Sequence, residues 1–393
     1  MTTVQAPTRN AADVLEAVTA LAPSISGRAE EIEQGRRLPP DLLDELKGAG
    51  AFRMLLPSSH GGIGVELPEA LRVLETLAAA DGSTGWTVMI GSGAWLDLTG
   101  LPRATFDAIY ADGPDVIVAG AINPSGVIEA VDGGYRVTGR WGFASGCEHA
   151  DWLFGDCVEQ VDGRAGGPDG PPRLRIALFS PDEVVIEDTW HVSGLRGTGS
   201  HHFHVDSVLV APERTHPPLE EDHCIDEPIV HIPAPSLLSC VVASVAIGIA
   251  QGALDDIVAL AVDKVPLLDA APLAKNPTFQ LDLATADTEL RAARSLVFDT
   301  AASLWSGAVA GEQLTLRQRA HVRSAAVWAT SRATAAVDAA YRAGGGSSVY
   351  MDSPLQRRLR DVHAVTQHFL VRPDAMTVAG AILAGNDIDL PLF

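Results

Sequence analysis

The stretch GYRVTGRWGFASGCEHADWLF, residues 134–154, decides which fold the sequence predicts. Its first half alternates around the preceding Asp132 and Gly133, which is the pattern of a β-hairpin. Small residues let a flat ring approach the backbone, and aromatic side chains can stack on such a ring. The small run 144–146 is surrounded by three aromatic residues, Trp141, Phe143 and Trp152. The stretch therefore indicates either the wall of a cofactor site or a β-bulge among core aromatics.

On either side of this stretch, the chain changes from helical to strand periodicity and back. Residues 10–110 show apolar spacings of three and four, with Asn10 as a helix cap and a helix from Pro40 to Gly48. Short strands follow until about Pro212, interrupted by a Gly- and Pro-rich surface loop at 162–172, and long helices occupy about 237–385. This segregated order predicts an α+β fold rather than a doubly wound one, with domains at 1–113, 114–215 and 216–393.

The amino-acid composition excludes some classes of binding partner and predicts the cellular compartment. Fifty acidic against 28 basic residues give a net charge of −22, which argues against nucleic acid or an anionic membrane as a partner. Four scattered cysteines without a CxxC pair, and a start without a secretory signal, predict a reduced, cytoplasmic protein. The apolar segment 237–262 is interrupted by Gln251, Asp255 and Asp256, so we expect a buried helix rather than a bilayer span.

Two motifs invite a ligand but have ordinary explanations. GLRGTGS, residues 194–200, lies between predicted strands and therefore lacks the strand-to-helix context of a dinucleotide site. In the strand 200–206, alternate residues His202, His204 and Asp206 share one face and could hold zinc. Because no second ligand cluster is visible, a polar outer face is the favoured interpretation, and we predict no metal site.

Several motifs in order resemble the acyl-CoA dehydrogenase superfamily over nearly the whole chain. Residues 55–86 resemble its N-terminal helical region, 134–154 its flavin wall, 194–213 the following strand motif and 344–363 its C-terminal glycine turn and helix. The resemblance implies an acyl-CoA dehydrogenase-like fold, with an N-terminal α-domain, a middle β-barrel-like domain and a C-terminal four-helix bundle. It also implies a homotetramer that binds flavin between the β-domain and the bundle.

The chain departs from the dehydrogenases where they carry their catalytic base. Most of them have a glutamate eight residues after the Asp of an Arg-Asp pair, and counting from Asp361 gives Phe369. A smaller subgroup has the base thirteen residues before a glutamine, and counting back from Gln251 gives Leu238. Neither side chain can accept a proton, so dehydrogenation lacks its proton-transfer step.

The chain is instead similar to the two-component (group D) flavin-dependent monooxygenases, which have a histidine seven residues after Arg-Asp. That histidine is His368 here. Helical spacing predicts that Asp361 and His368 lie on one stripe of a helix. The likeness implies an oxygenase component that receives reduced flavin from a separate reductase and hydroxylates an aromatic or polycyclic small molecule through a C4a-hydroperoxyflavin. N-oxygenation of nucleotide-linked amino sugars is the alternative. An acyl-CoA dehydrogenase and a flavin-free binding protein are less favoured.

The same resemblance implies roles for individual residues. His368 would deprotonate a phenol or orient the peroxide proton, and Ser145 would hydrogen-bond near the flavin N5 atom. Lys264 replaces the arginine that holds the FAD pyrophosphate, which favours FMN or loosely bound FAD. Further residues are expected to line the flavin site: Trp141, Phe143, Ala144, Gly146, Thr198 and Ser200. The substrate pocket is expected to include Trp86, Met89 and Ser92.

Overall fold

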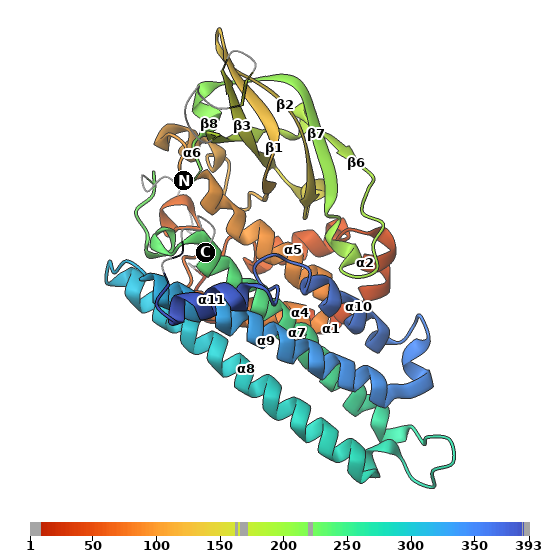
Figure 1. The fold of residues 1–393 in the computed structure, drawn as a ribbon. Coiled ribbons are helices and arrows are strands. Elements are labelled where there is room, and N and C mark those ends of the chain that lie inside the picture. The colour runs from red at the N-terminus through yellow and green to blue at the C-terminus, as the bar shows by residue number, and fades with distance from the viewer. Residues whose placement is uncertain (1–8, 162–163, 166–171, 219–222, 387, 389–393) are drawn as a thin grey trace, which may run out of the picture.

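A computed structural model describes residues 9–161, 164–165, 172–218, 223–386 and 388 of the chain (Figure 1). The expected order of helices, strands and helices is confirmed. The N-terminal helices are α1 (Ala11–Gly27), α2 (Ala29–Gly35), α3 (Pro40–Ala49), α4 (Leu67–Ala80), α5 (Gly82–Gly93) and α6 (Arg103–Ile109). Asn10 caps α1, as its sequence predicts, and the structure adds a capping box with Asp13. Helix α3 ends at Ala49, one residue beyond the predicted Gly48, and Gly50 caps it in the left-handed conformation.

The middle of the chain forms one sheet in the order β6-β7-β2-β1-β3-β5-β8, with β4 beside β3. Its strands are β1 (Val118–Val131), β2 (Gly134–Ala144), β3 (Trp152–Val161), β4 (Arg164–Ala165), β5 (Leu174–Phe179), β6 (Val185–Glu187), β7 (His201–Val210) and β8 (Thr215–His216). The predicted hairpin is present, because Val131 pairs with Gly134 across Asp132 and Gly133. The loop predicted at 162–172 lies mostly outside the described residues, and Arg164–Ala165 within it pair with β3.

The C-terminal helices are α7 (Ala234–Asp263), α8 (Pro277–Val309), α9 (Leu316–Gly344), α10 (Pro354–Val365) and α11 (Ala375–Leu383). In Figure 1 the long helices α7, α8 and α9 lie side by side, and the sheet sits on the opposite side of α4 and α5. Helix α7 is long and apolar enough to cross a membrane, but 89% of its most apolar window is buried inside the fold. It is therefore a core helix, as its interrupted apolar run predicts.

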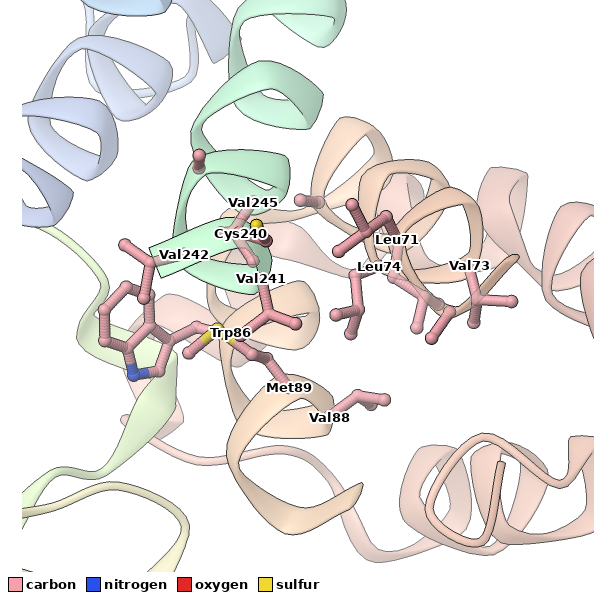
Figure 2. Packing of buried hydrophobic residues seen from close by; sticks show 14 of the residues in the cluster. Leu71, Val73, Leu74, Trp86, Val88, Met89, Cys240, Val241, Val242 and Val245 are labelled. Carbon is pink, nitrogen blue, oxygen red and sulfur yellow. The ribbon is translucent and has the colours of Figure 1, made fainter. Parts of the chain in front are cut away.

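Helices from both ends of the chain share one hydrophobic core, to which side chains of β1, β3 and β5 also contribute, and the sheet has a second core of its own. Side chains of α4, α5 and α7 pack together in the shared core, where Val241 and Val242 of α7 lie near Trp86 and Met89 of α5 (Figure 2). The separate core of the sheet is centred on Trp141, whose ring stacks on Phe203 with centroids 5.0 Å apart. Helix α5 packs against β1 of the sheet, and the end of β2 lies within reach of the Trp86 side chain, so residues from both layers can form a site there.

Candidate functional site

The indole of Trp86 on α5 contacts both of the residues that the sequence predicts to be catalytic. Its Nε1 donates a hydrogen bond to Ser145 Oγ at 3.1 Å, at the end of β2. The imidazole of His368 packs edge to face against the same indole, with centroids 5.5 Å apart. Trp86 is only 7% exposed, so this contact is largely shielded from water. Residues 86, 145 and 368 thus converge from three distant parts of the chain.

His368 does not lie on a helix, so the predicted stripe with Asp361 is wrong. Helix α10 ends at Val365, and the His368 backbone N–H bonds to the Val365 carbonyl at 3.0 Å in a tight turn. Leu370 and Val371, which follow this turn, are both buried in the core. The same turn directs the imidazole toward Trp86.

The imidazole of His368 is neutral across the physiological range. Burial, followed by the positive charge of Arg323, lowers the pKa of His368 to about 4. Its Nδ1 accepts the backbone N–H of Leu370 at 3.4 Å, so the single proton of the neutral ring belongs on Nε2. Nε2 makes no hydrogen bond with another described residue. Of the two predicted roles, this tautomer favours orienting an oxygen by donation over accepting a phenol proton.

Ser145 follows a strained bulge at the end of β2. The register of β2 against β7 shifts between Trp141 and Ala144, and Phe143 within the shift has a φ of 64°. This left-handed conformation is costly for a side chain with a Cβ atom. It leaves the Phe143 ring 74% exposed while Trp141 and Ala144 point into the sheet core. The bulge is therefore confirmed, but Phe143 is not one of the core aromatics, because the bulge leaves its ring on the surface.

A chain of hydroxyls extends from Ser145 into the short helix η5 (Arg196–Thr198) and the start of β7. Ser145 Oγ lies 2.7 Å from Ser200 Oγ, which lies 2.7 Å from Thr198 Oγ1. The Gly146 N–H also bonds to the Thr198 carbonyl at 2.9 Å. Thr198, Ser200 and Gly146 are thus placed beside Ser145, and their expected role in lining a flavin site stays a prediction.

The site suits a flat heterocycle with a polar edge. The exposed Phe143 ring is joined by Trp190 and His202, with centroids 6.1 and 6.4 Å away, and these rings can cover an aromatic face. Thr87, beside Trp86 on α5, has a buried hydroxyl without a hydrogen-bond partner in the described part of the chain. An orphaned buried hydroxyl needs a partner, and a ligand can supply one. The residues present therefore fit an isoalloxazine ring.

The sequence does not distinguish Thr87 or Trp190 as site residues. Thr87 lies within an ordinary apolar helix pattern, and Trp190 is brought to Phe143 only by the path between β6 and β7. A signal for Thr87 does exist in retrospect, because it directly follows the predicted pocket residue Trp86.

Several predicted residues are not brought to this site. Trp141 has no exposed surface and donates to the Asp156 carbonyl inside the sheet core at 2.8 Å. Met89 lies beside Trp86 in the shared core (Figure 2), and the Ser92 hydroxyl bonds to the Met89 carbonyl at 3.4 Å, so the expected place of these two residues in a substrate pocket stays a prediction. Lys264 ends α7, and its Nζ donates to the Gly344 carbonyl and to Ser347 Oγ, both at 2.7 Å. Lys264 therefore secures the predicted glycine turn of this chain.

The polar face of β7 carries ordinary ion pairs. His202 and His204 alternate with the buried His201, Phe203 and Val205, as predicted for a strand with a polar outer face. His204 Nδ1 lies 2.8 Å from a Glu187 carboxylate oxygen. No group of three potential metal ligands is found within the described ranges.

A cavity of about 520 Å³ lies elsewhere, between α1, α4, α7 and α8. Its charged lining is internally paired, since Arg294 bonds to Glu75 at 2.7 Å and Arg358 to Asp256 at 3.1 Å. An apolar aromatic substrate gains little from such a lining. The geometry around Trp86 is the better candidate site.

Comparisons with known proteins point in the same direction. Models described as the acyl-CoA dehydrogenase N-terminal and C-terminal domains match residues 11–99 and 240–373. An indole-3-acetate monooxygenase of Pseudomonas putida is 31% identical, over 91% of this chain and 90% of its own. A FADH(2)-dependent resorcinol hydroxylase, oxygenase component, of a Rhizobium species is 31% identical, over 94% of this chain and 93% of its own. The structure of XiaF from a Streptomyces species, in complex with FADH2 and glycerol, superposes with a TM-score of 0.89, is 26% identical and covers 97% of both chains.

Proposed function

Because this chain belongs to the acyl-CoA dehydrogenase superfamily and is one of its flavin-dependent monooxygenases, we propose that it hydroxylates a small aromatic or polycyclic molecule. It is the oxygenase component of a two-component system, and the partner is a reductase that supplies reduced FMN or FAD. The observation that carries this proposal is the convergence of Ser145 and His368 on one buried indole, with no carboxylate at either dehydrogenase base position.

The residues of the chain have separable roles in this reaction. When bound, reduced flavin supplies the electrons and activates dioxygen for the transfer of one oxygen atom. Ser145 hydrogen-bonds the polar edge of the ring, and Phe143 covers part of its face. Neutral His368 holds a proton at Nε2 and orients the reacting oxygen. Buried Trp86 keeps water away from both, which limits the loss of activated oxygen as hydrogen peroxide.

A direct assay tests the proposal. Chemically reduced FMN or FAD is mixed with the protein, air-saturated buffer and one of several aromatic compounds, including phenols and indole-3-acetate. At least one compound is expected to give a hydroxylated product and to lower the peroxide released per oxygen consumed. Peroxide release that is unaffected by every aromatic compound, with no product, would contradict the proposal.

Loss of the Phe143 ring is expected to weaken flavin binding without unfolding the protein. The ring is 74% exposed, so Phe143→Ala removes little packing and shortens a side chain on a strained backbone. Aromatic stacking contributes about 1 kcal/mol, which corresponds to a roughly fivefold to tenfold rise in the dissociation constant of reduced FMN. Anaerobic titration measures this change. Trp328→Ala on α9 is the control, and equal effects of the two variants would argue against a stacking role for Phe143.

We also infer a homotetramer, supported by an apolar patch at one end of the bundle. The patch consists of Leu267, Leu268, Val349, Tyr350 and Met351, which are 66–97% exposed. The bonds of Lys264 to Gly344 and Ser347 hold its two segments together. Water-exposed apolar side chains gathered in this way are typical of a subunit interface.

The four free cysteines support a cytoplasmic location.

Charges placed in this patch are expected to dissociate the assembly. The double variant Leu268→Asp with Tyr350→Asp should lower the mass measured by light scattering while leaving the melting temperature of the subunit fold within a few degrees. Val185→Asp, at an exposed apolar position on β6, is the matched control. A wild-type protein that is monomeric, or a double variant that keeps the wild-type mass, contradicts the inferred interface.

A further inference from the structure

Two buried carboxylates meet where α5, α10 and residues 194–200, the η5 loop, come together. Asp81 directly precedes α5 and Asp361 lies on α10, and they are only 2% and 3% exposed. A Cβ atom on Gly82, the first residue of α5, would lie 3.1 Å from Asp361 Oδ2. Asp361 therefore rests on the residue that directly follows Asp81, and any side chain larger than hydrogen there would crowd its carboxylate.

Each carboxylate fixes the start of a segment that reaches the candidate site. Asp81 accepts the Thr84 N–H at 2.8 Å and so caps α5, the helix that carries the central indole of the site. Asp361 Oδ1 accepts the Leu195 N–H at 2.7 Å. Leu195 begins the η5 loop, whose hydroxyls lie beside Ser145.

The η5 loop is held between the two helices. The Gly197 N–H donates to Ser83 Oγ on α5 at 3.1 Å. A Cβ atom on Gly194 would lie 2.0 Å from the Arg360 carbonyl, so the loop also lies directly on the backbone of α10. Leu195 has the left-handed φ of 52°, which a non-glycine residue keeps only where its surroundings determine it strongly. A change in the spacing of α5 and α10 therefore changes the geometry of the loop.

Arginines surround the two carboxylates, but their ion pairs are with other residues. Arg358 bonds to Asp256 on α7 at 3.1 Å, and Arg360 bonds to Glu33 on α2. Arg357 influences both buried carboxylates by its charge but, among the described residues, forms an ion pair with neither. The charged groups around the two carboxylates thus come from four elements: Arg357, Arg358 and Arg360 of α10, Arg196 of the η5 loop, Glu33 of α2 and Asp256 of α7.

The two carboxylates hold a proton that an unfolded chain releases. Burial, followed by the negative charge of Asp81, raises the pKa of Asp361 to about 7, and burial also raises the pKa of Asp81. An unburied aspartate releases its proton near pH 3.8, so the unfolded chain loses this proton first. The stability that the proton gives the fold is therefore lost as the pH rises from 3.8 through 7, where a second negative charge enters the buried site.

We propose that Asp361 is a positioning residue that forms a proton-sensitive joint with Asp81, and that this joint holds the η5 loop in its flavin-binding geometry only while one of the two carboxylates is protonated. The inference rests on the proposed function. When both are ionised, their charges repel each other and α10 moves away from α5. The loop, which is bonded to both helices, then loses its fixed geometry, reduced flavin binds more weakly and more oxygen is lost as peroxide.

Hydrogen exchange of the ligand-free protein tests the joint itself. After correction for the intrinsic pH dependence of exchange, peptides that cover residues 194–200 should lose about tenfold in protection between pH 6 and pH 8, the factor expected for a group that titrates near pH 7. Asp361→Asn and Asp81→Asn should both abolish this change. An asparagine keeps the oxygen that accepts the backbone N–H, and it has no charge at any pH.

Anaerobic titration with reduced FMN tests the link from the joint to the site. The dissociation constant should rise about tenfold more between pH 6 and pH 8 in the wild type than in either asparagine variant. The ionisation of the cofactor contributes equally to all three proteins, so the difference between them reports the joint alone.

Asp156→Asn is the matched control, because Asp156 on β3 is 6% exposed and burial also raises its pKa to about 7. It should keep the pH dependence of the wild type in both measurements. Loop protection that is constant between pH 6 and pH 8 in the wild type, or that changes equally in the asparagine variants, overturns the joint. Flavin binding that does not follow an observed loss of protection overturns the link to the site. A wild type that loses protection as expected but binds no flavin at any pH overturns the proposed function and supports the joint, so the two failures are distinguishable.

Discussion

Replacing His368 by alanine should abolish most hydroxylation while leaving oxygen consumption in place. The neutral imidazole is a preorganised donor in a site shielded from water, and removing such a donor typically costs a factor of about 100 or more. The variant leaves Ser145 and Phe143 in place, so we expect reduced flavin to bind still and its oxygen to be lost as peroxide. Stopped-flow product quantification, together with a peroxide assay, measures both quantities.

His363→Ala is the appropriate comparison. His363 is exposed, lies five residues earlier and pairs with Asp338 at 3.0 Å on α9. We expect its product yield to equal that of the wild type. Equal yields from His368→Ala and the wild type would remove His368 from the mechanism.

The lowered pKa of His368 also makes the stability of the protein depend on pH. The group is neutral when folded down to about pH 4, whereas the unfolded imidazole is protonated below about 6.5. The unfolded state therefore binds the extra proton first, and the free energy of unfolding falls as the pH drops from 6.5 toward 4, by up to about 3 kcal/mol. His368→Gln should lose this part of the acid sensitivity. Denaturant unfolding at pH 7 and pH 4.5 measures the difference.

Replacing Ser145 by alanine should affect both stability and oxygen use. The Trp86 N–H would lose its buried acceptor, which costs about 1–3 kcal/mol of unfolding free energy. The ligand would lose its partner on β2 as well, so the product formed per oxygen consumed should fall at least tenfold. Thermal melts and the product-to-peroxide ratio test the two effects separately.

Ser239→Ala controls for the loss of a buried hydroxyl as such. Ser239 is fully buried on α7, and its hydroxyl bonds to the Pro235 carbonyl at 2.6 Å. It should lower the melting temperature without changing the product-to-peroxide ratio. If Ser145→Ala changed only the melting temperature, Ser145 would be a structural residue.

The sequence predicts best those features that depend on short-range pattern. The turn at Asp132 and Gly133, the helix cap at Asn10 and the alternation along β7 each involve residues a few positions apart, and all three are confirmed. Burial of α7 is also predicted, because its few polar residues interrupt the apolar run.

The features that the sequence predicts less well depend on long-range packing. The helix before His368 ends at Val365, and Leu370 and Val371 after the turn are buried; helical spacing alone contains no sign of either. Trp141 and Phe143 are two residues apart on a strand, yet a register shift places one in the core and the other outside. The hydrogen bond that the Leu195 N–H donates to Asp361 joins residues 166 positions apart. Only the folded arrangement connects them.

The central claim is that this protein inserts one atom of dioxygen into an aromatic substrate. The most direct test uses ¹⁸O₂ with chemically reduced FMN, the protein and the aromatic compound that gives the highest product yield. Mass spectrometry of the hydroxylated product should show a single ¹⁸O atom, with its yield collapsing in His368→Ala. Product that carries only oxygen from water, or oxygen uptake recovered wholly as labelled peroxide, would contradict the account.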